Sequence, residues 1–62
     1  MTSRGVITRL QAAGWFEVAQ VGSHKQFKHP TPKGRVTEPH PQRDIPLGTL
    51  ASIERQSGVT LR

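Results

Sequence analysis

The chain has 62 residues, no cysteine and a formal net charge of +5, from nine Lys and Arg against four Asp and Glu. Such a length predicts a single small domain, residues 1–62, that buries only about 60% of its unfolded surface. The lack of cysteine excludes disulfides and thiolate zinc sites. No apolar run approaches the ~18 residues of a membrane span, and the N-terminal segment lacks the apolar core of a secretory signal, so we expect a cytoplasmic protein. The positive charge favours a polyanionic partner, most often nucleic acid, with a merely solubilising surface as the alternative.

The N-terminal segment predicts a helix over residues 4–13. Its apolar residues recur at helical spacing, as in a helix with one buried face. Ser3 is a suitable N-cap, and Gly14 stands where a helix commonly ends.

Three short strands are expected next, over residues 15–21, 24–28 and 35–38. The first is rich in aromatic and β-branched residues, which favour strands. A Gly-Ser pair at 22–23 predicts a tight turn between the first two strands. The next turn is expected at Pro30, Pro32 and Gly34.

The C-terminal third predicts a loop and then a helix. Three prolines exclude regular structure from residues 39–47. Helical spacing resumes over 49–56, with Gly58 as its end. We expect Val59 and Leu61 to fold back over the end of that helix.

This order of elements predicts an α+β fold. Short turns favour a three-stranded antiparallel meander. Both helices must bury their apolar faces, and one face of the sheet is the surface available to them. The other face is left to solvent or to a partner.

Alternation along the second strand decides which side chains lie on this open face. Phe27, the large apolar residue of the strand, should face the helices, and Lys25 shares its side. His24, Gln26 and Lys28 then lie on the open face. An imidazole therefore stands beside a basic group where a partner can reach it. An ordinary surface histidine is the alternative, since Gly-Ser-His alone is a weak motif.

RNA cleavage is the chemistry that suits such a histidine. The 2′-hydroxyl of RNA is an internal nucleophile, and its attack needs a base near neutral pH, an acid for the leaving oxygen and positive charge near the phosphate. Imidazole suits the first two roles, and lysine or arginine the third. No metal or cofactor is required, and none is expected.

Two other kinds of site are disfavoured. His24 and His29 are five residues apart, which puts them on opposite faces of one strand, and the four carboxylates form no metal-binding motif. A Ser-His-Asp triad is disfavoured because Ser23, next to His24 in an extended segment, points away from it.

Several segments resemble the HicA toxin family. Gly14-Trp15 and the run Gly-Ser-His-Lys-Gln-Phe-Lys-His-Pro at 22–30 are similar to the centre of these toxins. Pro-His-Pro at 39–41, Asp-Ile-Pro-Leu-Gly-Thr-Leu at 44–50 and the helix up to Gly58 are similar to their C-terminal half. The resemblance therefore extends from the first helix to Gly58.

The resemblance implies a fold like that of the double-stranded RNA-binding domain. It also implies a small ribonuclease that cleaves messenger RNA and arrests growth. Each member is paired with a HicB antitoxin that covers the active histidine. That histidine corresponds to His24.

Glu38 departs from the family pattern, which usually has an apolar residue, commonly valine, at this place in the third strand. By alternation Glu38 shares a face with Val36 and should point at the helices. A buried, unpaired carboxylate costs several kcal/mol. We therefore expect Glu38 either to reach solvent at the strand end or to pair with a base such as Arg43.

RNA contacts are predicted at Ser23, Lys25 and Lys28, with a solvated strand edge as the alternative for the lysines. His40, in the proline-rich loop, is a candidate second acid, with a plain turn residue as the alternative. Two further residues are expected to be structural: Trp15 in the core and His29 at a strand end.

The sequence thus predicts a metal-independent endoribonuclease that is the toxin of a toxin–antitoxin pair. A non-catalytic RNA-binding module of the same fold is the alternative, although residues 47–52 carry no lysine or arginine with which to grip a duplex groove. A protein-interaction subunit, whose basic face meets only an acidic antitoxin, is the third possibility. RNA cleavage that is lost on changing His24 would separate the first from the other two.

Overall fold

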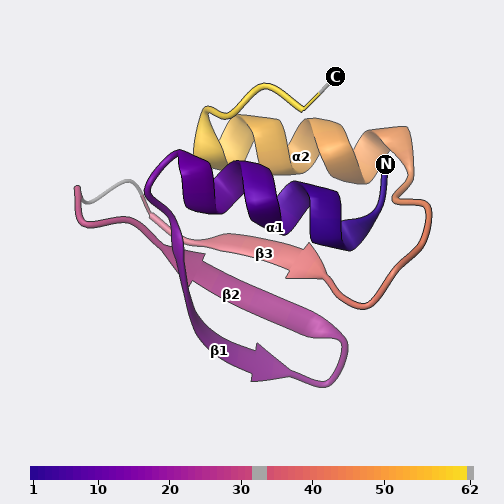
Figure 1. Cartoon of the computed structure of the whole chain (residues 1–62), viewed down its shortest axis with the longest axis horizontal. Helices are drawn as coiled ribbons and strands as arrows, with labels where there is room; N and C mark the ends of the chain where they lie inside the picture. The colour runs from indigo at the N-terminus through magenta and orange to yellow at the C-terminus, as the bar shows by residue number, and fades with distance from the viewer. Residues whose placement is uncertain (32–33, 62) are drawn as a thin grey trace.

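The structure is a computed structural model that describes residues 1–31 and 34–61 (Figure 1). Its elements are α1 (Ser3–Ala12), β1 (Phe16–Val21), β2 (His24–Lys28), β3 (Val36–Pro39) and α2 (Leu47–Ser57). The predicted helix–strand–strand–strand–helix order is confirmed. Pro32, which we placed in the second turn, lies outside the described residues.

The three strands form an antiparallel meander in the order β1-β2-β3. Both helices lie on the same side of this sheet (Figure 1), as predicted. His24 pairs with Val21 on one side and with Pro39 on the other. A register shift between Glu17 and Ala19 marks a bulge in β1.

A single apolar core lies between the helices and the sheet. Every helix and strand except β1 contributes to it, and its members are Val6, Leu10, Trp15, Phe27, Val36, Ile45, Leu50, Ile53 and Leu61. Leu61 is only 6% exposed, and Val59 packs against the core. The C-terminal segment therefore folds back as expected, and Trp15 is a core residue.

Strand β1 stands apart from this core. All six of its residues are exposed, and Figure 1 shows β1 at the edge of the sheet farthest from α2. The helices thus cover β2 and β3 and leave β1 held mainly by its pairing with β2. This leaves Phe16 and Val21, at 46% and 71% exposed, in contact with solvent.

The start of α1 differs from the expectation. Thr2, not Ser3, is the N-cap, and its hydroxyl accepts a hydrogen bond from the backbone N–H of Gly5 at 3.0 Å. Ser3 is instead the first helical residue and is 2% exposed. Either residue can cap a helix. Ser3 is drawn inward because its hydroxyl binds the loop after β3.

Helix α2 starts two residues earlier than predicted, at Leu47. Pro46 takes the N-cap position without a side-chain hydrogen bond, so no capping signal marks the start. Leu47 is 68% exposed and does not contribute to the buried stripe from which the helix was predicted. The helix ends at Gly58 as expected, with a left-handed φ of 74° that suits glycine.

Glu38 corrects another expectation. The residue faces the helices with Val36 and is fully buried, but it neither reaches solvent nor pairs with Arg43. Among the residues that the structure describes, neither carboxylate oxygen has a hydrogen-bond partner. Burial raises the pKa of Glu38 from 4.5 to about 7, against the opposing effect of Lys25 and with a small contribution from Glu17.

Replacing Glu38 by valine should therefore stabilise the fold, and the gain should depend on pH. Below pH 4.5 the carboxyl is protonated in both the folded and the unfolded chain. Between pH 4.5 and about 7 the unfolded chain loses its proton first, so the stability of the wild type falls as pH rises. Above pH 7 the full penalty, about 3 kcal/mol from this pKa difference, is present.

Urea unfolding of wild type and Glu38→Val across this pH range measures the effect. Asp44→Asn is the matched control, because the Asp44 carboxylate is 91% exposed. A Glu38→Val protein that is no more stable than the wild type above pH 7 would contradict the account.

Candidate functional site

His24 opens β2 directly after the turn at 22–23 and is exposed. Its position follows from alternation: Phe27, three residues on, is fully buried against the helices, so His24 faces the open side of the sheet. Its paired neighbours are Val21 and Pro39. Within the described residues its ring makes no hydrogen bond, which leaves both ring nitrogens available to a ligand.

Gln26 and Lys28 share the open face with His24, as predicted. Gln26 accepts a hydrogen bond from the Thr37 hydroxyl at 3.2 Å, which ties it to β3. Lys28 is exposed at the far end of the strand. It lies four positions after His24, which is about 13 Å along the strand backbone. The two side chains can therefore contact one extended ligand at two points, but not a single phosphate.

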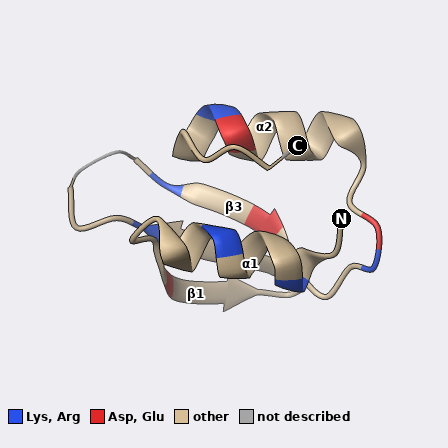
Figure 2. Cartoon of the chain, turned by 45° about the horizontal axis from the view of Figure 1, so that its top comes forward, with Lys and Arg blue, Asp and Glu red and all other residues tan. Residues whose placement is uncertain are grey.

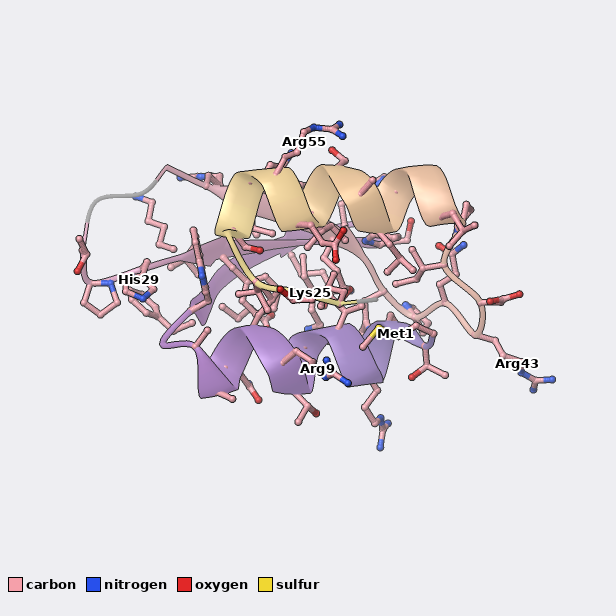
Figure 3. The ribbon with its side chains drawn as sticks, turned by 90° about the horizontal axis from the view of Figure 1, so that it is seen from above. Met1, Arg9, Lys25, His29, Arg43 and Arg55 are labelled. Atoms are coloured by element: carbon pink, nitrogen blue, oxygen red, sulfur yellow. The ribbon has the colours of Figure 1, made fainter. Side chains whose placement is uncertain are left out.

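Lys25 lies on the other face. Its ammonium donates to the Glu17 carboxylate at 2.9 Å and to the Gln20 side-chain oxygen at 3.0 Å, and its side chain is only 14% exposed. In Figure 3, which looks down on the helices, Lys25 is seen in the gap between the ribbons of α1 and α2. The charge of Lys25 is thus directed toward Glu17 and the buried Glu38, away from the imidazole of His24.

His40 is anchored beside the turn that precedes His24. Its backbone N–H donates to the Ser23 carbonyl at 2.7 Å, and its ring Nδ1 lies 2.8 Å from the Ser3 hydroxyl oxygen. That contact draws the ring toward α1, on the helix side. The structure therefore brings His40 and His24 to the same end of the sheet but on opposite faces. Ser23, between them, is exposed.

His29 is committed to holding the end of α1, in agreement with a structural role. Its Nδ1 accepts from the Thr31 N–H at 3.1 Å, so Nε2 carries the proton and donates to the Ala13 carbonyl at 2.9 Å. Its ring also meets Trp15 edge-on at 5.2 Å. A Cβ at Gly14 would lie 2.8 Å from Nε2, so glycine is needed there both for this contact and for its φ of 95°.

Two open-face residues escaped the sequence analysis. Val21 stands across from His24, and Phe16 across from Lys28. They are five residues apart, so simple alternation puts them on opposite faces, but the bulge between Glu17 and Ala19 brings them to one face. An exposed apolar side chain therefore lies beside each of His24 and Lys28.

Charge and ligand chemistry complete the picture. Basic residues are distributed over the helices, strands and loops rather than gathered in one block (Figure 2). Within residues 1–31 and 34–61, no three His, Asp or Glu side chains come close enough to hold a metal ion. In the same part of the chain, no helix is long and apolar enough to span a bilayer.

Comparison with known proteins decides the family. A family model described as "HicA toxin of bacterial toxin-antitoxin" matches residues 3–59, which include all five elements. The chain belongs to the HicA toxin family. A solved structure titled "HicA3 and HicB3 toxin-antitoxin complex" contains a chain that is 32% identical, with a TM-score of 0.80 and full coverage of both chains. No curated protein matches the sequence.

Membership of the HicA family confirms the resemblance noted in the sequence and accounts for the order of the elements. The family is that of the toxins of bacterial toxin–antitoxin systems.

Proposed function

We propose that this HicA-family chain is an endoribonuclease that cleaves messenger RNA without a metal ion and uses His24 as its single catalytic histidine. The observation that carries the proposal is the placement of His24. Its imidazole is exposed and unbonded within the described residues, on the sheet face that the helices leave open. The other two histidines each have a ring nitrogen engaged by the fold.

The proposed reaction follows from the chemistry of RNA. Neutral His24 takes the proton of a 2′-hydroxyl, and the 2′-oxygen attacks the adjacent phosphorus. The bond from phosphorus to the 5′-oxygen of the next nucleotide breaks, and that oxygen takes a proton from the surrounding water. The products are a 2′,3′-cyclic phosphate and a 5′-hydroxyl, and His24 then returns its proton to solvent.

The substrate path we propose runs along the open face. Lys28 holds a phosphate some nucleotides away from the cleaved bond, because it lies about 13 Å from His24 along the strand. The Ser23 hydroxyl contacts the RNA next to His24. Phe16 and Val21 offer exposed apolar surface to the bases, which in single-stranded RNA are unstacked and free to contact it.

The role proposed for Lys25 is indirect. A phosphate that reached its ammonium would have to displace both Glu17 and Gln20. Lys25 instead links β2 to β1 through its bonds to Glu17 and Gln20. It therefore affects RNA binding by fixing the position of the turn at 22–23, which precedes His24.

We also propose that a HicB-type antitoxin is the partner and that it covers His24. Support comes from the solved HicA3–HicB3 complex, one chain of which matches this one along its full length. The net charge of +5 favours acidic side chains on the antitoxin surface that binds here. A complex of the two proteins in which His24 remains fully exposed would contradict inhibition by coverage.

His24→Gln should abolish RNA cleavage and growth arrest and leave the fold intact. Glutamine keeps hydrogen-bonding capacity but cannot carry the proton, and this proton transfer is worth roughly 100- to 10,000-fold in rate. Because His24 is exposed, the loss of stability should stay within ~0.5 kcal/mol. Cleavage of a defined RNA in EDTA, with melting curves for both proteins, is the measurement.

The matched control is Gln11→Ala, which alters an exposed residue of α1 away from the open face. Full activity of folded His24→Gln would overturn the proposal. RNA binding by the wild type without any cleavage would support the non-catalytic RNA-binding module.

Lys28→Gln should weaken the binding of single-stranded RNA and make it less sensitive to salt. Removing one lysine–phosphate interaction should flatten the slope of log affinity against log salt by about 0.7. Titrations at several salt concentrations measure this slope. Arg55→Gln removes one positive charge from α2 and should leave the slope nearly unchanged. Equal slopes for Lys28→Gln and Arg55→Gln would contradict an RNA path along β2.

A further inference from the structure

A hollow of about 400 Å³ lies where the start of α1 meets the loop after β3. Residues 2–4 and 40–43 line it. Its volume is within the ~300–1,000 Å³ range of small-molecule sites. Neither the family match nor the proposed cleavage site accounts for this hollow.

The walls of the hollow are held in place by hydrogen bonds between distant parts of the chain. The Ser3 N–H donates to the Gln42 carbonyl at 2.8 Å, and the Gln42 N–H donates to the Ser3 hydroxyl oxygen at 2.9 Å. Farther along, the Ile45 N–H donates to the Met1 carbonyl at 2.9 Å. Since Ser3 is 2% exposed, its bonds are shielded from water and the loop is held in a defined position.

The same hydroxyl controls what His40 offers to the hollow. The Ser3 hydroxyl oxygen accepts from the Gln42 N–H and also lies 2.8 Å from Nδ1 of His40. When the hydroxyl donates to Nδ1, neutral His40 carries its proton on Nε2, and Nε2 donates a hydrogen bond. The protonated ring donates from Nε2 as well.

Two arginines add positive charge. Arg4 and Arg43 both line the hollow, both are exposed, and neither forms an ion pair with any described residue. No carboxylate is among the lining residues, and Asp44 directs its carboxylate to the Met1 amine at 3.5 Å. Figure 3 shows Arg43 extending from its loop into solvent, where its guanidinium can fold over a ligand.

We propose that this hollow is a phosphate-binding subsite for single-stranded RNA, formed by Arg4, Arg43 and the imidazole of His40. The inference rests on the proposed function, since it adds a second contact to the same RNA path. Guanidinium groups bind phosphate through paired N–H donors. The subsite takes a phosphate upstream or downstream of the cleaved one, not the cleaved phosphate itself.

A backbone hydrogen bond links the hollow to the segment that carries His24. The His40 N–H donates to the carbonyl of Ser23, the residue before His24. Because the two imidazoles lie on opposite faces, RNA that contacts both must pass over the end of the sheet, across the turn at 22–23. Such a bend requires a flexible single strand and excludes a rigid duplex. An acidic protein segment is the other chemistry that the hollow could accept, and it is tested below.

The test uses the full chain with His24→Gln, so that bound RNA is not consumed. Into this background we introduce Arg4→Gln, Arg43→Gln or both, with Arg55→Gln as the matched control. The probe is a short, fluorescently labelled single-stranded RNA, titrated at several salt concentrations. Each hollow variant should weaken binding by roughly 3- to 10-fold and flatten the salt slope by about 0.7, and the double variant should show about twice the change in slope.

Hollow variants that bind RNA like Arg55→Gln would overturn the subsite. A poly-glutamate peptide is the comparison ligand, and a loss confined to this peptide would overturn the RNA subsite in favour of a protein contact. Cleavage by the wild type is measured separately. Intact cleavage with unaffected binding would refute only the subsite, whereas absent cleavage with weakened binding would refute only the nuclease.

Discussion

The packing of Phe27 against the helices determines the rest of the site. Phe27, the fourth residue of β2, is fully buried in the core, to which α1, α2 and β3 also contribute. Once its ring points inward, alternation turns Lys25 inward as well and turns His24 and Lys28 outward. One hydrophobic contact thus decides which charged groups meet a ligand and which meet the core.

This orientation was predictable because β2 has a single large apolar residue, and only one of the two possible orientations of the strand buries that residue against the helices. The same reasoning placed Glu38 on the helix side with Val36. Its fate was not predictable: whether a carboxylate at a strand end finds a partner depends on side chains from distant segments. Lys25, its cross-strand neighbour, is held by Glu17 instead, and the Glu38 side chain has no hydrogen bond to any described residue.

Other features escaped prediction because they depend on long-range backbone contacts. The bulge in β1 has no marker in the sequence, yet it determines that Phe16 and Val21 share a face. Likewise, Ser3 has the chemistry of an N-cap, and only its bonds to Gln42 and His40 explain why Thr2 caps α1. The hollow beside these bonds joins residues nearly forty positions apart. Helical and strand spacing, being local, could predict the elements but not this junction.

The central claim is that His24 acts on the 2′-hydroxyl of RNA, and the chemical ends of the products test it most directly. Wild-type protein is incubated in EDTA with a defined RNA, and the fragments are analysed by mass spectrometry. The account predicts a 2′,3′-cyclic phosphate on one fragment and a 5′-hydroxyl on the other, with no cleavage when the nucleotide on the 5′ side of the cleaved bond lacks its 2′-hydroxyl. Fragments that carry a 5′-phosphate, or cleavage of that deoxy-substituted RNA, would contradict it.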